Sequence, residues 1–234
     1  MSYEPDPHVI QMKVLRYLLL SPQGTFANLR KDADMQSDQF TFHLKKLVKA
    51  GYITKSDNGA YELTRAGKEY ANRMDTDENV IEKQPKISVV LVVENDKGEH
   101  LQQQRLKHPY YGYWGHATGK VRWGETLVEA GARELKEETG LTADLRVVGF
   151  YHKLDYDKTS GDLLEDKYFC LIHGTNPQGE LIADAEGHHN EWMSNAEFAK
   201  KDKQFGSVTE TTKLVHQPGH VMVEQKYHYD PDDY

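Results

Sequence analysis

The stretch GKVRWGETLVEAGARELKEETGL, residues 119–141, constrains the fold of this chain more than any other. From about Glu125 to Glu138 it contains no proline and is rich in alanine, leucine, glutamate and lysine, a composition that predicts a helix. Gly140 then stands where a residue in the left-handed conformation would end that helix. Helical spacing also predicts one small apolar face that packs on a sheet, formed by Val128, Gly131, Ala132 and Leu135.

Three glutamates share the neighbouring face of the same helix: Glu134, Glu137 and Glu138. They repel one another, and they fall in the last turn, where the helix dipole disfavours negative charge. A solvated charged face is the ordinary explanation of such a run, but it leaves the flanking glycines and Arg133 unexplained. Magnesium takes oxygen ligands and keeps waters and substrate phosphate in its remaining positions. We therefore expect the three carboxylates to hold Mg²⁺, with Mn²⁺ as an alternative.

The whole stretch resembles the Nudix box, G-x5-E-x7-R-E-U-x-E-E-x-G-U, where U is an aliphatic residue. Every fixed position of the box is filled here, by Gly119, Glu125, Arg133, Glu134, Leu135, Glu137, Glu138, Gly140 and Leu141. The resemblance implies an α+β fold of the Nudix type, an α/β/α sandwich in which a mixed sheet lies between helices. It also implies an enzyme that hydrolyses a phosphoric anhydride bond in a nucleoside diphosphate linked to another group.

Roles for single residues follow from the same resemblance. Glu134, Glu137 and Glu138 are expected to be catalytic metal ligands, and the backbone carbonyl of Gly119 is expected to be a further ligand. Arg133 would orient the glutamates by ion pairing, with Glu129 as one partner, and Glu125 would be structural. The general base is one of the three glutamates or Glu186.

A second segment, AEGHHNEWMS at residues 185–194, resembles the corresponding part of MutT-like oxidised-nucleotide pyrophosphohydrolases. There the first glutamate supplies a further carboxylate to the metal site. Glu186 takes that role by position, with Glu165 and Asp166 as alternatives. His188 and His189 are expected to be exposed loop residues, because magnesium sites prefer oxygen ligands.

Substrate contacts are expected from Arg105, Lys120 and Arg122, which can bind phosphate or be solvated at the surface. Trp114 and the aromatic residues before it can line a base or sugar pocket, although most of them should close the core. Candidate substrates are nucleoside triphosphates, ADP-ribose and related sugars, dinucleoside polyphosphates and NADH. The EWMS resemblance favours triphosphates.

Charge and composition divide the chain into three parts: residues 1–75, a polar linker at 76–85, and residues 86–234. The first part holds 11 Lys and Arg against 9 Asp and Glu, and the remainder holds 18 against 28. A single cysteine, Cys170, excludes an intrachain disulfide and favours a reducing compartment. No apolar run approaches ~20 residues and no signal peptide is visible, so we expect a cytoplasmic protein without a membrane segment.

The first part is predicted to contain a helix that starts at Pro7 and runs to Leu20, and further helices at 26–31 and 38–50, with Ser37 as the N-cap of the third. Two short strands at 52–54 and 61–63 follow, and Thr64 caps a last helix. This order resembles the small winged helix-turn-helix domain of bacterial regulators. The third helix of such domains enters the major groove of double-stranded DNA, and its candidate contacts here are Thr41, His43, Lys45, Lys46 and Lys49.

Two functions therefore remain open. In the first, the chain is a working pyrophosphohydrolase whose N-terminal domain packs on the enzyme or forms a homodimer. In the second, it is a DNA-binding transcription regulator whose Nudix fold senses a nucleotide metabolite. The intact box favours the first, because a pure sensor can lose its catalytic glutamates.

The last part is predicted to have strands at 86–93, 99–106, 145–156 and 167–174. The polar residues 157–166 would form a mobile loop at the edge of the active site. Ser194 and Glu197 form a capping box for a short helix, and a further helix is expected near 209–216. The last seven residues, HYDPDDY, are expected to be frayed.

Overall fold

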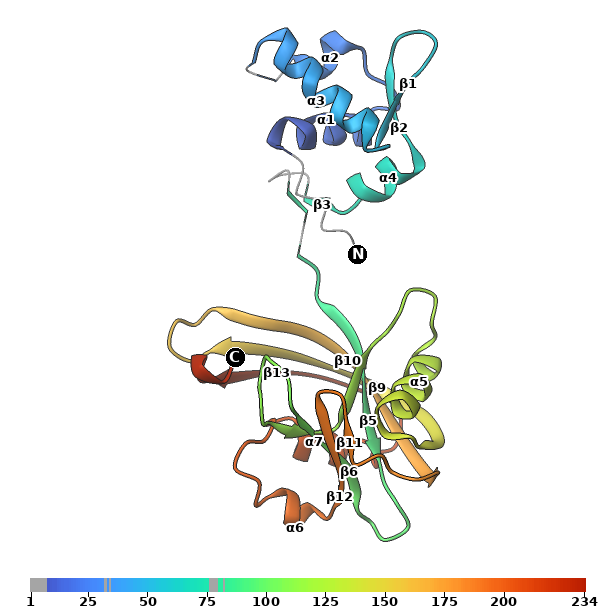
Figure 1. The fold of residues 1–234 in the computed structure, drawn as a ribbon, viewed down its shortest axis with the longest axis vertical. Coiled ribbons are helices and arrows are strands. Elements are labelled where there is room, and N and C mark those ends of the chain that lie inside the picture. The colour runs from blue at the N-terminus through green and yellow to red at the C-terminus, as the bar shows by residue number, and fades with distance from the viewer. Residues whose placement is uncertain (1–7, 32, 34, 76–79, 82) are drawn as a thin grey trace. The chain divides into compact units, whose positions relative to one another are not determined.

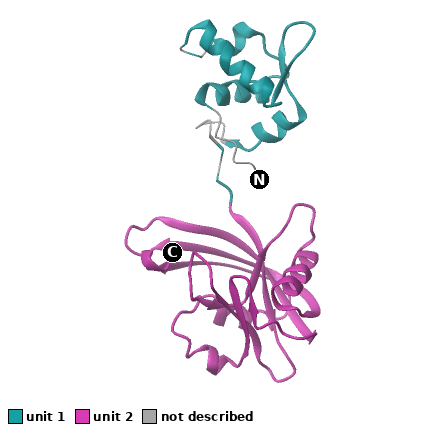
Figure 2. Cartoon of the chain, viewed as in Figure 1, with its two compact units in different colours: residues 1–84 teal, residues 85–234 magenta. Residues whose placement is uncertain are grey.

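The computed structural model describes residues 8–31, 33, 35–75, 80–81 and 83–234. The chain forms two compact units, residues 1–84 and 85–234 (Figure 2). Of the predicted linker, residues 76–79 and 82 lie outside the described residues. Within the same segment, β4 (Val80–Ile81) pairs with β3 (Met74–Asp75) in a short antiparallel ladder.

The first unit has the predicted order of three helices, a hairpin and a helix (Figure 1). Its elements are α1 (Val9–Leu20), α2 (Phe26–Arg30), α3 (Ser37–Lys49), β1 (Ile53–Lys55), β2 (Tyr61–Leu63) and α4 (Arg65–Ala71). Thr64 caps α4 as predicted, by accepting a hydrogen bond from the backbone of Gly67. The prediction for Ser37 is wrong, because Gln36 is the N-cap and Ser37 is already helical. The core of the unit is formed by residues that include Leu15, Phe40, Leu44, Leu47 and Ile53.

The second unit is built on a five-stranded mixed sheet with the order β13-β9-β10-β5-β8. Its strands are β5 (Lys86–Val93), β8 (Ala117–Lys120), β9 (Thr142–Asp157), β10 (Leu163–Gln178) and β13 (Val221–Tyr229). A second sheet has the order β11-β12-β6-β7. Its strands are β6 (His100–Arg105), β7 (Trp114–Gly115), β11 (Asp184–Ala185) and β12 (His188–Met193). The helices are α5 (Leu127–Thr139), α6 (Asn195–Phe198) and α7 (Val208–Leu214), with a 3₁₀ turn at Pro231–Asp233.

Helices cover both faces of the five-stranded sheet (Figure 1). Leu135 of α5 packs with Val89 and Leu91 on one face. Leu214 of α7 packs with Val90 and other residues on the opposite face. The strand β5 serves both cores because successive side chains of a strand point to opposite faces. This arrangement confirms the predicted mixed sheet between helices.

Helix α5 begins and ends for local reasons. Thr126 and Glu129 form a capping box at its start, and Gly140 ends it at φ 74°. The predicted apolar face is partly wrong, because Val128 and Ala132 are exposed. The buried positions of the helix are Ala130, Gly131, Leu135 and Thr139.

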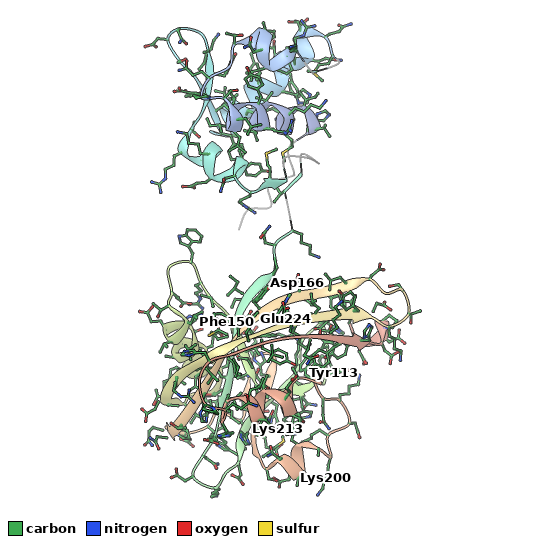
Figure 3. All side chains as sticks on the ribbon, turned by 180° about the vertical axis from the view of Figure 1, so that it is seen from behind. Tyr113, Phe150, Asp166, Lys200, Lys213 and Glu224 are labelled. Carbon is green, nitrogen blue, oxygen red and sulfur yellow. The ribbon has the colours of Figure 1, made fainter. Side chains whose placement is uncertain are left out.

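Two predictions about polar segments are also wrong. Half of residues 157–166 belong to the strands of the β9–β10 hairpin, and residues 158–162 form its turn. The last residues are not frayed, because β13 runs beside β9 to Tyr229 and the 3₁₀ turn follows. The hydroxyl of Tyr113, labelled in Figure 3, donates to Asp233 Oδ2 at 2.8 Å. The Tyr234 hydroxyl lies 3.2 Å from Glu165 Oε1, so the end of the chain is anchored beside the sheet.

Candidate active site

A cavity of about 640 Å³ lies on the face of the main sheet that α7 covers. Alternate residues of β5, β9 and β10 line it, as the two-residue period of a strand requires. Helix α7 and the segment before it contribute Ser207, Val208 and Thr211. Glu134 and Glu138 of α5 reach the same cavity beside the edge strand β8. The cavity therefore combines carboxylates from the box at residues 119–141 with side chains from three strands of the sheet.

Gly119 is placed directly against Glu134. A Cβ atom added to Gly119 would stand 1.9 Å from Glu134 Cδ, far inside van der Waals contact. The glycine of the box is therefore needed for close approach and not for an unusual backbone angle. As a result, backbone oxygen donors of β8 and the carboxylate of Glu134 can face one ion together.

Arg133 is the hub of the ion pairs around the box. Its Nη2 lies 2.8 Å from Glu125 Oε2, and its Nη1 lies 2.7 Å from Glu134 Oε1 and 3.3 Å from Glu137 Oε2. Hydrogen bonds from Arg133 lower the pKa of Glu125 to about 2. The predicted partner Glu129 does not take part, because its carboxylate closes the capping box with Thr126. Arg133 thus holds Glu125 and two of the three box glutamates, as a positioning residue would.

Glu138 has a different environment, because it faces polar residues of the second sheet. Gln103 Nε2 donates to Glu138 Oε2 at 3.1 Å, and His188 Nε2 lies 3.5 Å from Glu138 Oε1. Asn190 accepts a bond from Gln103 and donates to the Glu138 backbone carbonyl. Burial raises the pKa of Glu138, and the nearby charge of Glu134 raises it further. A carboxylate with a raised pKa is a better proton acceptor than an ordinary one.

The oxygen donors of the box suit a hard divalent cation. The side chains of Glu134 and Glu138 are 14% and 16% exposed, whereas Glu137 is 51% exposed and is bonded to Arg122 and Arg133 at the edge of the site. The charge of Glu134 raises the pKa of Glu138, as expected for two neighbouring carboxylates that repel each other. A divalent cation would offset that repulsion, so the donor set fits Mg²⁺ better than a softer metal.

A row of three lysines lines the cavity away from the box. Lys167 of β10 is paired in register with Lys86 of β5 on one side and with Lys153 of β9 on the other. The three side chains therefore share one face of the sheet, and we call them the lysine row. Two carboxylates lie beside them, with Lys86 Nζ 2.7 Å from Glu165 Oε2 and Lys153 Nζ 2.7 Å from Asp155 Oδ2.

Lys153 is the most enclosed member of this row. Its ammonium lies 4.9–6.0 Å from the ring centroids of four aromatic residues, Tyr110, Phe205, Tyr227 and Tyr229. Burial lowers the pKa of Lys153 to about 8, although the Asp155 carboxylate acts in the opposite direction. The lysine row therefore includes one cation that can lose its proton within the working range of many enzymes.

Comparison with known proteins identifies the family of the second unit. The family model described as "NUDIX domain" matches residues 84–211, and one described as "Domain of unknown function (DUF7347)" matches residues 8–74. The first match covers more than half of the chain. The chain belongs to the Nudix family. This membership confirms the assignment to the Nudix hydrolases that the box suggested.

Individual relatives agree with the assignment. The Nudix chain is 31% identical over 136 residues to the isopentenyl-diphosphate Delta-isomerase of Serratia proteamaculans (strain 568), covering 51% of this chain and 73% of that protein. It is 31% identical over 100 residues to the putative nudix hydrolase 1 of Caenorhabditis elegans, covering 41% of this chain and only 26% of the nematode protein. The crystal structure of the mutator MutT protein from Bacillus halodurans superposes with a TM-score of 0.51 at 22% identity, covering 64% of this chain and 93% of that one. That superposition supports the fold.

The structure brings most, but not all, of the predicted contact residues to the Nudix cavity. Arg105, Lys120 and Arg122 line it, although the Arg105 guanidinium is bonded to the carbonyls of His108 and Pro109. Trp114 does not line it, because its indole packs in a core with Met193, Phe198 and Val208.

The further carboxylate also differs from expectation. Glu186 is exposed in the turn between β11 and β12 and does not line the cavity. Glu165, the alternative, does line it and is 5% exposed. Sequence spacing alone does not say which of these glutamates points into the cavity.

Two residues of the site were not predicted. His188 was expected to be exposed, but it is buried in β12 beside Glu138, and burial lowers its pKa to about 4. Gln103 had no assigned role. The available signal was the alternation of His188 and Asn190 on one strand, which places both on the same face.

The structure also addresses two predictions outside the site, the role of Cys170 and the membrane segment. Cys170 is buried, and burial raises the pKa of its thiol to about 11, so it packs in the core as a small apolar residue. Within the part of the chain that the structure describes, no helix has the length and apolar character needed to cross a membrane.

The residues proposed to contact DNA all lie on α3. Lys45, Lys46 and Lys49 are exposed, whereas the hydroxyl of Thr41 donates to the Ser37 carbonyl. His43 packs its ring 4.4 Å from that of His8. Three of the five side chains are thus exposed, and Thr41 and His43 are partly exposed.

Proposed function

We propose that this protein is a magnesium-dependent pyrophosphohydrolase that cleaves a phosphoric anhydride bond in a nucleotide, such as a nucleoside triphosphate or a related compound. The observation that supports the proposal most is that Glu134 and Glu138 of the box line the same cavity as the lysine row. The carboxylates suit a divalent cation, and the lysines suit the phosphate charge that the cation leaves unbalanced. A volume of about 640 Å³ suits a ligand of nucleotide size.

The cation would be held by Glu134, Glu137, Glu138 and the carbonyl of Gly119, once Glu137 turns from its arginine partners. When bound, Mg²⁺ supplies neutralisation of phosphate charge and a lowered pKa of bound water. Glu138 accepts the proton of the attacking water, because its carboxylate lines the cavity beside the proposed cation. Gln103 and His188 fix its orientation. The oxygen of water bonds to phosphorus, the anhydride P–O bond breaks, and the leaving phosphate carries the electron pair.

Arg133 acts on this chemistry as a positioning residue. It holds Glu134 against β8 and also donates to the Lys120 carbonyl at 3.1 Å. Because Lys120 and Arg122 lie at the same edge of the cavity, one arginine fixes both the carboxylates and the strand end that carries phosphate-binding groups. Arg105, Lys120 and Arg122 are proposed to bind substrate phosphate together with the lysine row.

The test is magnesium-dependent release of phosphate or pyrophosphate across a panel of nucleoside triphosphates, ADP-ribose, dinucleoside polyphosphates and NADH. We expect the full chain to turn over at least one of these compounds. This turnover should be lost in Glu138→Gln and kept in the exposed control Glu191→Gln. Isopentenyl diphosphate belongs in the same panel, because one relative is named as an isomerase of that compound. Isomerisation without hydrolysis of any nucleotide would overturn the proposal.

A second candidate is a DNA-binding regulator that senses a nucleotide through the Nudix unit. It is favoured by the order of elements in residues 8–74 and by the exposed lysines Lys45, Lys46 and Lys49 on α3. These lysines, with Thr41 and His43, would meet double-stranded DNA, and a homodimer would present two such helices. We expect the wild type to retard DNA fragments at low salt in a gel-shift assay. The triple variant Lys45→Ala/Lys46→Ala/Lys49→Ala should not retard them. Equal retardation by both would contradict it.

A further inference from the structure

A cluster of histidines and one glutamate lies outside the cavity of the second unit. Glu94 follows β5, His100 begins β6, and His216 follows α7. Glu94 Oε2 lies 3.9 Å from His100 Nε2 and 3.5 Å from His216 Nε2. One ligand atom from each of these three residues lies within 4.8 Å of the other two. None of the three lines the cavity, so the cluster is separate from the box glutamates.

His173 supports this cluster from β10. Its Nε2 lies 2.9 Å from Glu94 Oε1, the carboxylate oxygen that does not face the other two histidines. Its ring packs 5.1 Å from the ring of His216 in an edge-to-face arrangement. A ligating carboxylate is commonly oriented by such an outer hydrogen bond, so His173 stands where a partner of a metal ligand would be.

His100 is the observation that points to a ligand. Only 5% of the residue is exposed, and neither ring nitrogen has a hydrogen-bond partner among the described residues. Buried polar atoms are rarely left unpaired, because burial removes their bonds to water. Its Nε2 faces the Glu94 carboxylate at an ion-pair distance too long for a hydrogen bond. A metal ion between these atoms would give Nε2 of His100 a partner without any new side chain.

The donor set indicates which metal would bind. Imidazole nitrogen with carboxylate oxygen suits zinc, whose bonds to these atoms are roughly 2.0–2.2 Å. Adjacent ligands of a tetrahedral ion with such bonds are about 3.3–3.6 Å apart by geometry. The distances of 3.5 and 3.9 Å around Glu94 therefore require only small movements. Magnesium, by contrast, prefers oxygen alone.

We propose that Glu94, His100 and His216 form a zinc-class metal site, with His173 orienting Glu94. The site ties the end of α7 to the turn between β5 and β6. Because the segment before α7 and the helix itself place Ser207, Val208 and Thr211 in the cavity, the metal fixes one boundary of the active site without entering it. The proposal rests on these four side chains and is independent of the reaction proposed above.

The test uses the full chain stripped with a chelator, with zinc chloride and cobalt chloride as the probes. His216→Ala removes a half-exposed ligand, so this variant should fold, and His220→Ala removes an exposed histidine four residues away as the matched control. The wild type and His220→Ala should bind one more equivalent of Zn²⁺ than His216→Ala. His173→Ala should weaken that equivalent by roughly 10–100-fold, as loss of an outer partner does. Equal zinc stoichiometry in the wild type and His216→Ala would overturn the proposal.

Two further readouts separate this site from binding of zinc at the box. Cobalt in the wild type should give the intense visible absorption of four-coordinate Co²⁺, and Glu138→Gln should keep it. Hydrogen exchange of the amides of α7 should slow on addition of zinc in the wild type and not in His216→Ala. Cobalt absorption that disappears in Glu138→Gln and persists in His216→Ala would assign the metal to the box and refute the separate site.

Discussion

The box glutamates, of which Glu134 and Glu138 line the cavity, and the lysine row on its other side are built in opposite ways. Glu134, Glu137 and Glu138 come from a single turn and a half of α5, so their proximity follows from helical spacing. Lys86, Lys167 and Lys153 come from three strands, and only the register of the sheet brings them together. The first group is a local feature of the sequence, whereas the second exists only in the folded protein.

Their electrostatics differ in the same way. The glutamates repel one another, and Arg133 balances part of their charge. A divalent cation can offset the repulsion that remains. The lysines are already balanced in part by Glu165 and Asp155, which keeps buried cations in place when no anion is bound. We therefore expect changes in the glutamates to act on turnover and changes in the lysines to act on substrate affinity.

The largest effect is expected from Glu138→Gln. The substitution keeps the shape and the bond from Gln103 but removes the carboxylate that holds the cation and accepts a proton. We expect kcat to fall by a factor on the order of 10²–10⁴, with KM changed much less. Steady-state kinetics with saturating Mg²⁺ measures both, and a rise in KM at constant kcat would contradict the assigned role.

Gly119→Ala should come next, because the added methyl group collides with Glu134. A Cβ at 1.9 Å from Glu134 Cδ forces that side chain away from β8. We expect kcat to fall by about 10²-fold, while the melting temperature changes little because the colliding atoms are the far end of a flexible side chain. The double variant Gly119→Ala/Glu134→Ala should be no slower than Glu134→Ala alone. Additive losses would show that the glycine acts through something else.

The same division between local features and long-range contacts separates what the sequence predicts correctly from what it does not. The strand bounds 86–93, the helix order of the first unit and the left-handed Gly140 were predicted because each depends on neighbouring residues. The helix face was misjudged at Val128, since tertiary packing decides which side of a short amphipathic helix is buried.

Longer-range contacts explain the remaining misses. The end of the chain has polar composition, but pairing of β13 with β9 orders it. The lysine row and the contact of His188 with Glu138 depend on strand register between segments up to about eighty residues apart, which composition and spacing do not encode. The opposite face of the same hairpin shows a similar case, where His152 bonds both Asp166 and Glu224, labelled in Figure 3.

Lys167→Gln should separate the lysine row from the box glutamates, because it should change substrate affinity and not turnover. Lys167 is the central member of the lysine row, and loss of one phosphate-binding cation should raise KM by roughly tenfold. We expect kcat to stay within about threefold of the wild type, because the box is untouched. Lys200→Gln, an exposed lysine labelled in Figure 3, is the control for net charge. Equal changes in both variants would mean that the row has no specific role.

The pH dependence of KM should report Lys153. Its charge is present below about pH 8 and lost above it, so affinity for an anionic substrate should fall as pH rises through about 8. The free energy of unfolding should rise between about pH 8 and 10. In that range the unfolded chain, with an ordinary lysine, binds more protons than the folded protein. Both trends should be absent in Lys153→Gln. A KM that is independent of pH in the wild type would remove Lys153 from the binding site.

The smallest effect is expected from Tyr234→Phe at the end of the chain. The Tyr234 hydroxyl lies 3.2 Å from Glu165 Oε1 and donates to the Leu164 carbonyl, so it helps to hold the carboxylate that balances Lys86 and Lys167. Because the ring stays and those lysines remain bonded to Glu165, we expect KM to rise by no more than about threefold, from loss of roughly 0.5 kcal/mol. A change in kcat in place of KM would show that Glu165 belongs with the box glutamates and not with the lysine row.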